Sequence, residues 1–221
     1  ERLMQFGYSS SWKRLSWNVS WSYSNTARQG TGNNNASDNT SEQIYMLSLS
    51  VPLSGWWGNS YATYSVSQND NSGSSHQLGL SGTALERNNL SWNLMQSYNS
   101  HDDEVGGNMS LTYDGTYGTV NGSYNYSQNS QRLNYGIRGG ILAHSEGVTL
   151  SQELGETIAL VKAPGAAGLE IDNMRGAATD WRGYTVKTQL NPYDENRVAI
   201  SDNYFSKSNI ELDNTVVTMV P

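Results

Sequence analysis

Hydrophobic and polar residues alternate along most of the chain, and this alternation limits the fold more than any other feature. Across residues 15–23, Leu, Trp, Val, Trp and Tyr occupy every second position, with Ser or Asn between them. Successive side chains of a β-strand point to opposite faces, so the pattern predicts strands with one apolar and one polar face. Helical spacing does not prevail over any useful length. The sequence therefore predicts an all-β, antiparallel fold, with further strands around residues 47–51, 78–80, 90–94, 109–113, 120–126 and 133–137.

The connections between these strands alternate in length. Long polar connections are expected near residues 25–41, 69–75 and 99–106, and short ones near 53–58, 84–88 and 114–118. Antiparallel strands that cross a membrane place successive connections on opposite sides, and outer-membrane barrels have longer loops outside than in the periplasm. A soluble β-sandwich has no comparable reason to alternate. The connections therefore favour a transmembrane β-barrel.

The aromatic residues are unusual for a soluble core. The chain has 14 Tyr and 7 Trp but only 2 Phe, whereas soluble cores are built largely from Leu, Ile, Val and Phe. Tyr and Trp combine an apolar body with a polar tip and are enriched at membrane interfaces. We therefore expect Trp17, Trp21, Trp56, Trp57 and Trp92 to face lipid or the interface. If the apolar face instead met a protein core, the polar face would be an ordinary wet exterior.

Several other classes of protein are excluded by composition. The chain has no cysteine for disulfides or thiol chemistry, and no apolar stretch is long enough for a transmembrane helix. A net charge of −7 argues against nucleic acid, whose binding proteins carry a basic footprint. No signal peptide opens the chain, and Glu1 directly precedes a strand-like run, so we expect an internal fragment of a longer protein.

No constellation of side chains predicts an enzyme, a cofactor or a metal site. His76, His101 and His144 are scattered, and none has a second His or Cys at ligand spacing. The acidic run that follows His101 is typical of a solvated loop, with a divalent-cation site as the alternative. Neither a Gly-x-Ser-x-Gly nucleophile motif nor a phosphate-cradling loop occurs.

From about residue 148 the character of the chain changes. Gly, Ala, Pro and charged residues become more frequent, and strand-like runs shorten to stretches such as 157–162 and 184–189. Turn residues are evident at 163–165 and 191–193. Composition alone leaves two alternatives: a separate small β-domain, or later barrel strands with folded connections.

A series of short segments, taken in order, resembles the outer-membrane fimbrial ushers of the chaperone–usher pathway. The resemblance covers essentially the whole chain and begins upstream at 51–59 and 79–83. One departure lies at 205–211, where the family has a Pro-containing turn and a Val. The segments downstream are 135–136, 139–144 with Gly139 and Gly140, 147–150, 160–166, 179–184 with Asp180, Trp181, Arg182, Gly183 and Tyr184, 193–198 with Tyr193, Asn196 and Arg197, 212–216 with Asp213 and Asn214, and 220–221.

The resemblance implies a partial barrel, the C-terminal half of a usher pore of about 24 strands. Residues 1–147 would be transmembrane β-barrel strands with alternating long and short connections. Residues 148–221 would be later barrel strands and connecting loops that lead to an absent last strand and absent C-terminal periplasmic domains. The plug and the chaperone-binding domain would also lie outside this chain.

The function implied by the resemblance is a non-enzymatic pore in the bacterial outer membrane that secretes pilus subunits and supports their assembly. Its partners would be chaperone–subunit complexes, the growing pilus, outer-membrane lipid and a second usher in a dimer, with no cofactor and no nucleic acid. The signature residues would be structural or would contact the plug or a subunit. For residues 180–184, the structural alternative is a tight turn capped by Asp180 with Trp181 stacked on Arg182.

Two alternatives from other classes stay open on residues alone. The first is another outer-membrane barrel, such as an autotransporter translocator or a porin, which would lack the ordered segments after residue 135. The second is a soluble extracellular β-adhesin, whose Trp17, Trp21 and Trp92 would pack into a protein core.

Overall fold

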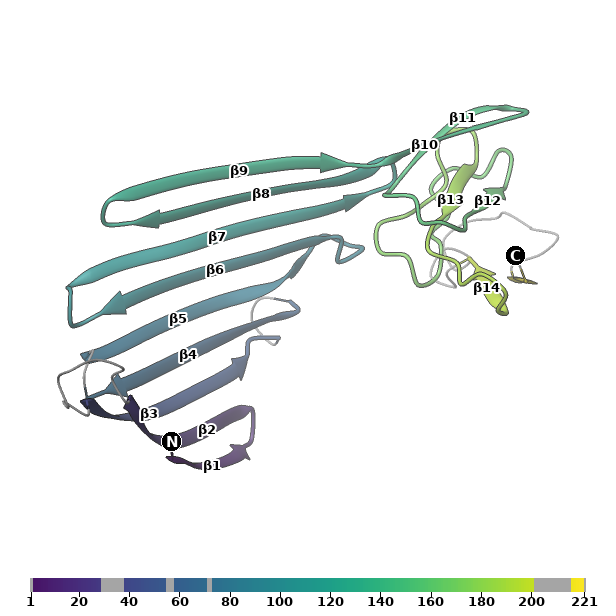
Figure 1. Ribbon diagram of the computed structural model, residues 1–221. Helices are drawn as coiled ribbons and strands as arrows, with labels where there is room; N and C mark the ends of the chain where they lie inside the picture. The colour runs from purple at the N-terminus through teal and green to yellow at the C-terminus, as the bar shows by residue number, and fades with distance from the viewer. Residues whose placement is uncertain (1, 29–37, 55–57, 71–72, 201–215, 221) are drawn as a thin grey trace. The chain divides into compact units, whose positions relative to one another are not determined.

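Nine long strands make up most of the N-terminal two thirds of the chain. The computed structural model describes residues 2–28, 38–54, 58–70, 73–200 and 216–220. In it the nine strands lie in one sheet in simple sequence order, each beside its chain neighbour (Figure 1). They are β1 Arg2–Trp12, β2 Leu15–Arg28, β3 Asp38–Pro52, β4 Ser60–Asn69, β5 Gly73–Ala84, β6 Leu90–Asn99, β7 Glu104–Gly115, β8 Gly118–Ser127 and β9 Ser130–Arg138.

The lengths of these strands suit a membrane crossing. The shortest, β9, has 9 residues and the longest, β3, has 15. A tilted strand needs about 9–11 residues to cross the hydrocarbon core of a bilayer. No helix in the described part of the chain is long and apolar enough to span a membrane. The predicted all-β, antiparallel fold is confirmed.

The register of the sheet separates the side chains into two faces. Trp17 pairs with Leu49, Leu49 with Tyr64, and Tyr64 with Leu78, which forms one continuous apolar row across four strands. Directly paired residues share a face and neighbours in sequence do not, so the alternation predicted from sequence is realised as one apolar and one polar face. The row next to it is polar and runs Asn18, Ser48, Ser65, Gln77.

Two connections are shorter than predicted. β4 ends at Asn69 and β5 begins at Gly73, while β6 ends at Asn99 and β7 begins at Glu104. Polar residues placed in the predicted connections extend the ladder instead: Ser67 pairs with Ser75, and Ser100 donates its N–H to the carbonyl of Ser74 at 2.8 Å. The expected contrast with the short connections is therefore not seen here. At 85–89 and 116–117, the short connections lie close to their predicted positions.

The remaining strands are short and pair in twos. Their lengths are 4 or 5 residues, below the length that crosses a membrane. The assignment of 148–221 to later barrel strands stays a prediction. The pairs are β10 Gly140–His144 with β11 Gly147–Ser151, β12 Ala159–Lys162 with β13 Tyr184–Lys187, and β14 Asn196–Ala199 with β15 Val216–Met219.

Hydrophobic burial is confined to this C-terminal region. Within the described residues, every buried hydrophobic side chain lies between Ala163 and Ala199. Leu169 and Val186 are fully buried, and Ala163, Ala166 and Leu169 form a cluster against which Ile200 packs. Residues 139–200, called the C-terminal module below, therefore have a core of their own.

The chain divides into two compact units. The first contains residues 1–82, 92–110 and 123–133, which are most of β1–β8. The second contains residues 134–221 together with 83–91 and 111–122, the ends of two hairpins. The turns β5–β6 and β7–β8 thus belong to the same unit as the C-terminal module.

Candidate functional site

The polar face of the sheet is the first candidate site. Its side chains are mostly Ser, Asn, Thr and Gln, and the apolar exceptions on β1–β4 include Leu3, Ile44, Met46, Pro52 and Tyr61. They bond to one another or to the strands beside them: Asn108 Nδ2 donates to Asn125 Oδ1 at 2.5 Å, and Ser97 Oγ donates to the Gly106 carbonyl at 3.3 Å. Small groups satisfied in this way present a wet surface with little charge and few apolar side chains.

Residues 180–184 form the second candidate site, a tight turn between the core and β13. Asp180 Oδ1 accepts hydrogen bonds from the backbone N–H of Arg182 at 2.8 Å and of Tyr184 at 2.9 Å. Gly183 has a φ of +88°, and a Cβ there would lie 1.9 Å from the Ala163 carbonyl oxygen. Only glycine fits both the backbone conformation and the space.

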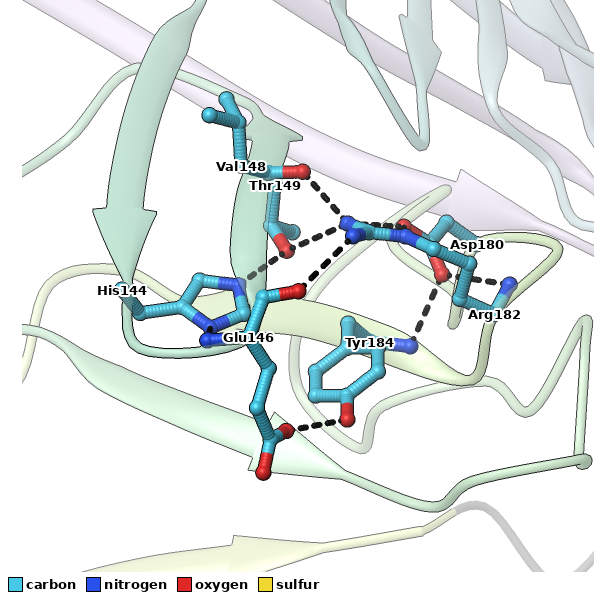
Figure 2. A network of polar contacts seen from close by, with 7 residues as sticks. All are labelled: His144, Glu146, Val148, Thr149, Asp180, Arg182 and Tyr184. Atoms are coloured by element: carbon cyan, nitrogen blue, oxygen red, sulfur yellow. Dashed lines mark hydrogen bonds and ion pairs between the residues drawn. The ribbon is translucent and has the colours of Figure 1, made fainter.

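Arg182 is the centre of a polar network (Figure 2). Its guanidinium forms an ion pair with Asp180 at 3.2 Å and donates to the carbonyl oxygen of Val148 and to Thr149 Oγ1. It therefore ties the 180–184 turn to β11. The Trp181 ring lies 5.7 Å from the guanidinium carbon, but 79% of Trp181 is exposed.

Glu146 links a second set of partners in the same network. Its two carboxylate oxygens accept hydrogen bonds from Lys162 Nζ and from the Tyr184 hydroxyl. The His144 ring stacks on Tyr184 with centroids 5.3 Å apart, and His144 Nε2 lies 3.0 Å from Thr149 Oγ1. The β10–β11 hairpin is thereby joined to β12 and β13.

The charges in the network stabilise one another. Burial alone would raise the pKa of the Asp180 carboxyl, but the backbone N–H groups of Tyr184 and Arg182, with the guanidinium, bring this pKa below its usual value. Hydrogen bonds from Lys162 and Tyr184 lower the pKa of Glu146, and the same contacts raise the pKa of Lys162 and Tyr184. None of these pKa values moves toward neutrality, where a general acid or base works best. The arrangement joins the 180–184 turn to the β10–β11 hairpin and to β12 through mutually paired charges.

The other signature residues have separate places. A Cβ on Gly140 would lie 2.3 Å from Leu154 Cγ, and one on Gly139 would lie 3.0 Å from the Ser151 carbonyl oxygen, so both glycines allow close packing. Asn196 is buried and closes the 191–196 loop: it accepts from the Asn191 N–H at 2.8 Å and donates to the Asn191 carbonyl at 2.7 Å.

The structure does not gather all the predicted residues into one site. Arg197 lies 3.8 Å from Asp172 in an exposed ion pair, and Tyr193 is 92% exposed. Asp213 and Asn214 lie outside the described residues. The Asp180-capped turn is present as predicted, whereas the exposure of Trp181 shows that its contact with Arg182 covers little of the ring.

The predicted lipid-facing aromatics lie on the apolar face where they are described. The Trp21 ring stacks on Phe6 at 5.7 Å, and the Trp17 ring lies 5.2 Å from that of Tyr8. Trp92 is half-buried on β6. Trp56 and Trp57 lie outside the described residues. No group of His, Cys, Asp or Glu in the described ranges could hold a metal ion.

Sequence reasoning missed the residues that join the hairpin turns to residues 170–176. Gly176 packs on Asp114, and Arg87 pairs with Glu170 at 2.9 Å. It also missed Thr179, whose hydroxyl bridges the Ala166 carbonyl and the Leu169 N–H inside the core. Each partner is far away in sequence or hidden by an ordinary local pattern. The one local signal in the sequence was the glycine at 176, a residue type that tolerates the positive φ found there.

Comparison with known proteins places these features in a family context. Residues 1–221 match the family model described as outer membrane usher protein. The chain is 39% identical to the probable outer membrane usher protein ElfC of Escherichia coli O157:H7, covering 100% of this chain and 26% of ElfC. It is 36% identical to the outer membrane usher protein FimD of Escherichia coli K12, covering 98% of this chain and 25% of FimD.

A solved structure has a similar fold. A chain of the E. coli P pilus tip assembly intermediate PapC-PapD-PapK-PapG matches 99% of this chain and 26% of its own length, with a TM-score of 0.70 and 18% identity. At that identity the likeness concerns the fold, and it confirms the predicted partial barrel. The chain spans about a quarter of the length of the relatives that it matches.

Proposed function

We propose, on the premise that this chain belongs to the family of outer membrane usher proteins, that it forms part of the wall of a pore that exports pilus subunits. Its place is the bacterial outer membrane. The whole protein would accept subunits brought by a periplasmic chaperone, support their assembly, and pass the growing fibre through its lumen. This chain would supply later strands of the wall and the module that follows them.

The observation that carries the proposal is the pair of adjacent rows in the sheet. The apolar row through Trp17, Leu49 and Leu78 needs a nonpolar environment, and the described residues of the first unit contain no buried hydrophobic side chain that could supply one. Lipid satisfies this need, because burying apolar surface is favourable by about 25 cal/mol per Å². Strands of this length with an apolar outer face are the wall of an outer-membrane barrel.

The polar face is then the surface of the lumen. A folded subunit in transit would meet small hydroxyl and amide groups, such as those of Asn18, Ser48 and Ser65, rather than a large apolar patch. Exposed apolar patches bind proteins, so their scarcity here keeps a passing fibre from adhering.

The partners follow from the relatives. The solved relative PapC is part of a P pilus tip assembly intermediate with PapD, PapK and PapG. We infer that the parent of this chain binds chaperone–subunit complexes and a growing pilus in the same manner. Subunits would join when an extended segment of one completes the sheet of its neighbour, a form of β-strand addition.

Catalysis of that exchange would be by positioning and not by chemistry at a side chain of this region. The charged groups of the Arg182 network serve one another as hydrogen-bond partners. Within the signature set, Asp180, Gly183 and Asn196 are structural, whereas Trp181 and Tyr193 project outward and are candidates for contact with the plug or a subunit.

The decisive experiment is surface piliation, scored by electron microscopy, in cells that lack the full-length parent gene but keep its neighbouring operon. We expect loss of pili, subunits retained in the periplasm, and rescue by the full-length gene. Normal pili with the protein still in the outer membrane would point to another class of barrel. Normal pili with a soluble protein would contradict the barrel as well.

A second experiment tests the lumen assignment. In the full-length protein, Asn18, Ser48 and Ser65 are replaced together by Leu, which creates an apolar patch on the polar face. We expect fewer fibres at an unchanged amount of folded barrel in the membrane. The matched control places Leu at Trp17 and Tyr64 on the opposite face, beside the native Leu49, and should leave export intact. Equal piliation in both variants would contradict the assignment.

A further inference from the structure

The backbone of residues 170–176, called the anchor loop below, lies close to the backbone of two hairpin turns of the sheet. Gly176 has a φ of +71°, and a Cβ there would lie 1.9 Å from the Asp114 carbonyl oxygen and 3.2 Å from Asn89 Cβ. Asn89 is itself buried, and its Nδ2 donates to the same Asp114 carbonyl at 3.1 Å. The glycine therefore sits on a platform built from the turn ends of β5–β6 and β7–β8.

Polar contacts surround this point on several sides. Arg87 Nε lies 2.9 Å from Glu170 Oε1, with each side chain about one-third exposed. Arg175 Nη1 donates to Ser91 Oγ at 3.1 Å. Both contacts join the anchor loop to the β5–β6 hairpin. Glu170 reaches Arg87 in the turn, and Arg175 reaches Ser91 on β6.

The β7–β8 turn is attached by a glutamine. Gln152 Nε2 donates to the Gly115 carbonyl at 3.3 Å and to the Arg175 carbonyl at 2.7 Å, so one amide bridges the turn and the anchor loop. Thr116 Oγ1 adds a contact of 3.5 Å to the Gly176 carbonyl. Two hairpins and one loop are thus connected by side chains from all three.

The anchor loop is also held from the side of the module. The Asp172 N–H donates to the Ala199 carbonyl at 2.8 Å, and Ile171, which is buried, forms a bridge with Ile200. The Lys187 ammonium, itself buried on β13, donates to the carbonyls of Asp172 at 3.0 Å and Asn173 at 3.4 Å. The anchor loop is thus bonded both to the hairpin turns and to the rest of the module.

We propose that the anchor loop rigidly fixes the C-terminal module to the turn ends of the β5–β6 and β7–β8 hairpins, and that fibre export requires this attachment. Gly176, Arg87 and Glu170 are positioning residues in this proposal. The proposal rests on the proposed export function. Without the anchor loop, the module would be joined to the sheet only by the chain that follows β9. Its surface would then have no fixed position relative to a subunit in transit.

The first test compares two glycines in the full-length protein. Gly176→Ala adds a methyl group where the Asp114 carbonyl leaves no room, whereas Gly168→Ala adds one at a similar φ of +80° with nothing within 4 Å. The backbone strain is therefore shared and only the contact differs. We expect G176A to lose surface fibres and G168A to keep them, at equal amounts of heat-resistant barrel in the outer membrane. Equal fibre numbers in the two variants would overturn the proposal.

The second test is a charge exchange that remains informative if G176A fails to fold. Arg87→Glu and Glu170→Arg should each reduce fibre number, because each places like charges opposite each other, and the double exchange should restore it. The matched control reverses Arg138 and Glu153, an exposed pair in the same unit at 3.7 Å, and should have no effect. Reduced export without rescue in the double exchange would overturn the role of the pair.

The third test asks whether the attachment is rigid during transport. The chain has no cysteine of its own, so Arg87→Cys with Glu170→Cys can be linked by a short bis-maleimide, with the treated parent as control. We expect linked protein to export at the level of the same variant unlinked. If cross-linking stopped export, the contact would have to open during transport, and the proposal would be overturned.

The gene deletion separates this proposal from the proposed export function. If deletion leaves pili intact, the export function is wrong. If deletion abolishes pili and every anchor-loop variant exports normally, only the role of the anchor loop is wrong.

Discussion

In the nine-stranded sheet, large hydrophobic side chains on interior strands, such as Tyr45 and Leu78, are 49% and 50% exposed, whereas in the C-terminal module Leu169 and Val186 have no exposure at all. Both regions are built from β-strands joined by turns. The two regions differ in what surrounds their apolar side chains. In the proposed pore the sheet turns its apolar face to lipid, whereas the module buries its apolar side chains against one another.

The difference shows that strand content says little about where stability resides. In the proposed pore the sheet depends on a bilayer and on its neighbouring strands, because exposed edges and an apolar face are both unfavourable in water. The module depends on close packing and on buried hydrogen bonds such as those of Thr179. Substitutions of the same kind should therefore differ strongly in their cost between the two regions.

The largest expected effect is a cavity in the module. Leu169→Ala removes a fully buried side chain and should destabilise the module by about 2–5 kcal/mol. Leu94→Ala, at a position that is 41% exposed on the interior strand β6, should cost far less. Protease release of a C-terminal fragment from the membrane-embedded full-length protein measures the first effect. Similar sensitivity in both variants would remove the contrast between the regions.

The next effect is a charge placed on either face of the sheet. Leu78→Arg puts a guanidinium on the apolar face, which costs about 2–4 kcal/mol near the bilayer midplane. Ser65→Arg, from the adjacent polar row, faces the lumen and should cost little. The readout is the fraction of heat-resistant barrel in outer-membrane preparations. A stronger loss for S65R than for L78R would mean that the two faces have been assigned in reverse.

A smaller effect is expected from the cap of the 180–184 turn. Asp180→Ala leaves two backbone N–H groups and the Arg182 guanidinium without their acceptor, at a cost of about 1–3 kcal/mol. Asp194→Ala is the control, because among the described residues that carboxylate accepts from the neighbouring Glu195 N–H alone, at 2.9 Å, and it is exposed. Protease release should increase for D180A and stay at the parent level for D194A. No difference between them would contradict the structural role given to Asp180.

The smallest effect is the pH dependence that the same carboxylate confers. The pKa of Asp180 in the folded module lies below its ordinary value of about 3.9. A group with a lowered folded pKa contributes stability that is present above the unfolded pKa and is lost as pH falls through the folded pKa. The module should therefore lose stability in acid below about pH 4. Asp180→Asn should flatten this part of the profile, and an unchanged profile would exclude Asp180 as its source.

The sheet could be read from sequence because its rule is local. At residues 15–23 the alternation assigns each side chain to a face, and the register confirms the assignment with Trp17 opposite Leu49 and Asn18 opposite Ser48. Connection lengths could not be read equally well. Residues 73–75 are polar enough for a loop but pair with residues 67–69 of β4, because the ladder is formed by backbone groups that Ser and Gly also supply.

The candidate site was predictable in part. The Asp-x-x-Gly spacing at residues 180–183 predicts a capped turn, since a carboxylate two residues before an N–H is a local arrangement. The partners of that turn were not predictable. Val148 and Thr149 approach Arg182 only because β10–β11 and the 180–184 turn fold together, across more than thirty residues of chain.

Local chemistry in the sequence was thus sufficient for the strands, their two faces and the Asp180-capped turn. The tertiary structure decided that Gly176 lies on Asp114, that Arg87 meets Glu170, and that hydrophobic burial is concentrated in residues 163–199. The physical reason is the range of each interaction. Side-chain alternation and turn conformation depend on neighbours along the chain, whereas packing and ion pairs depend on which distant segments the fold brings together.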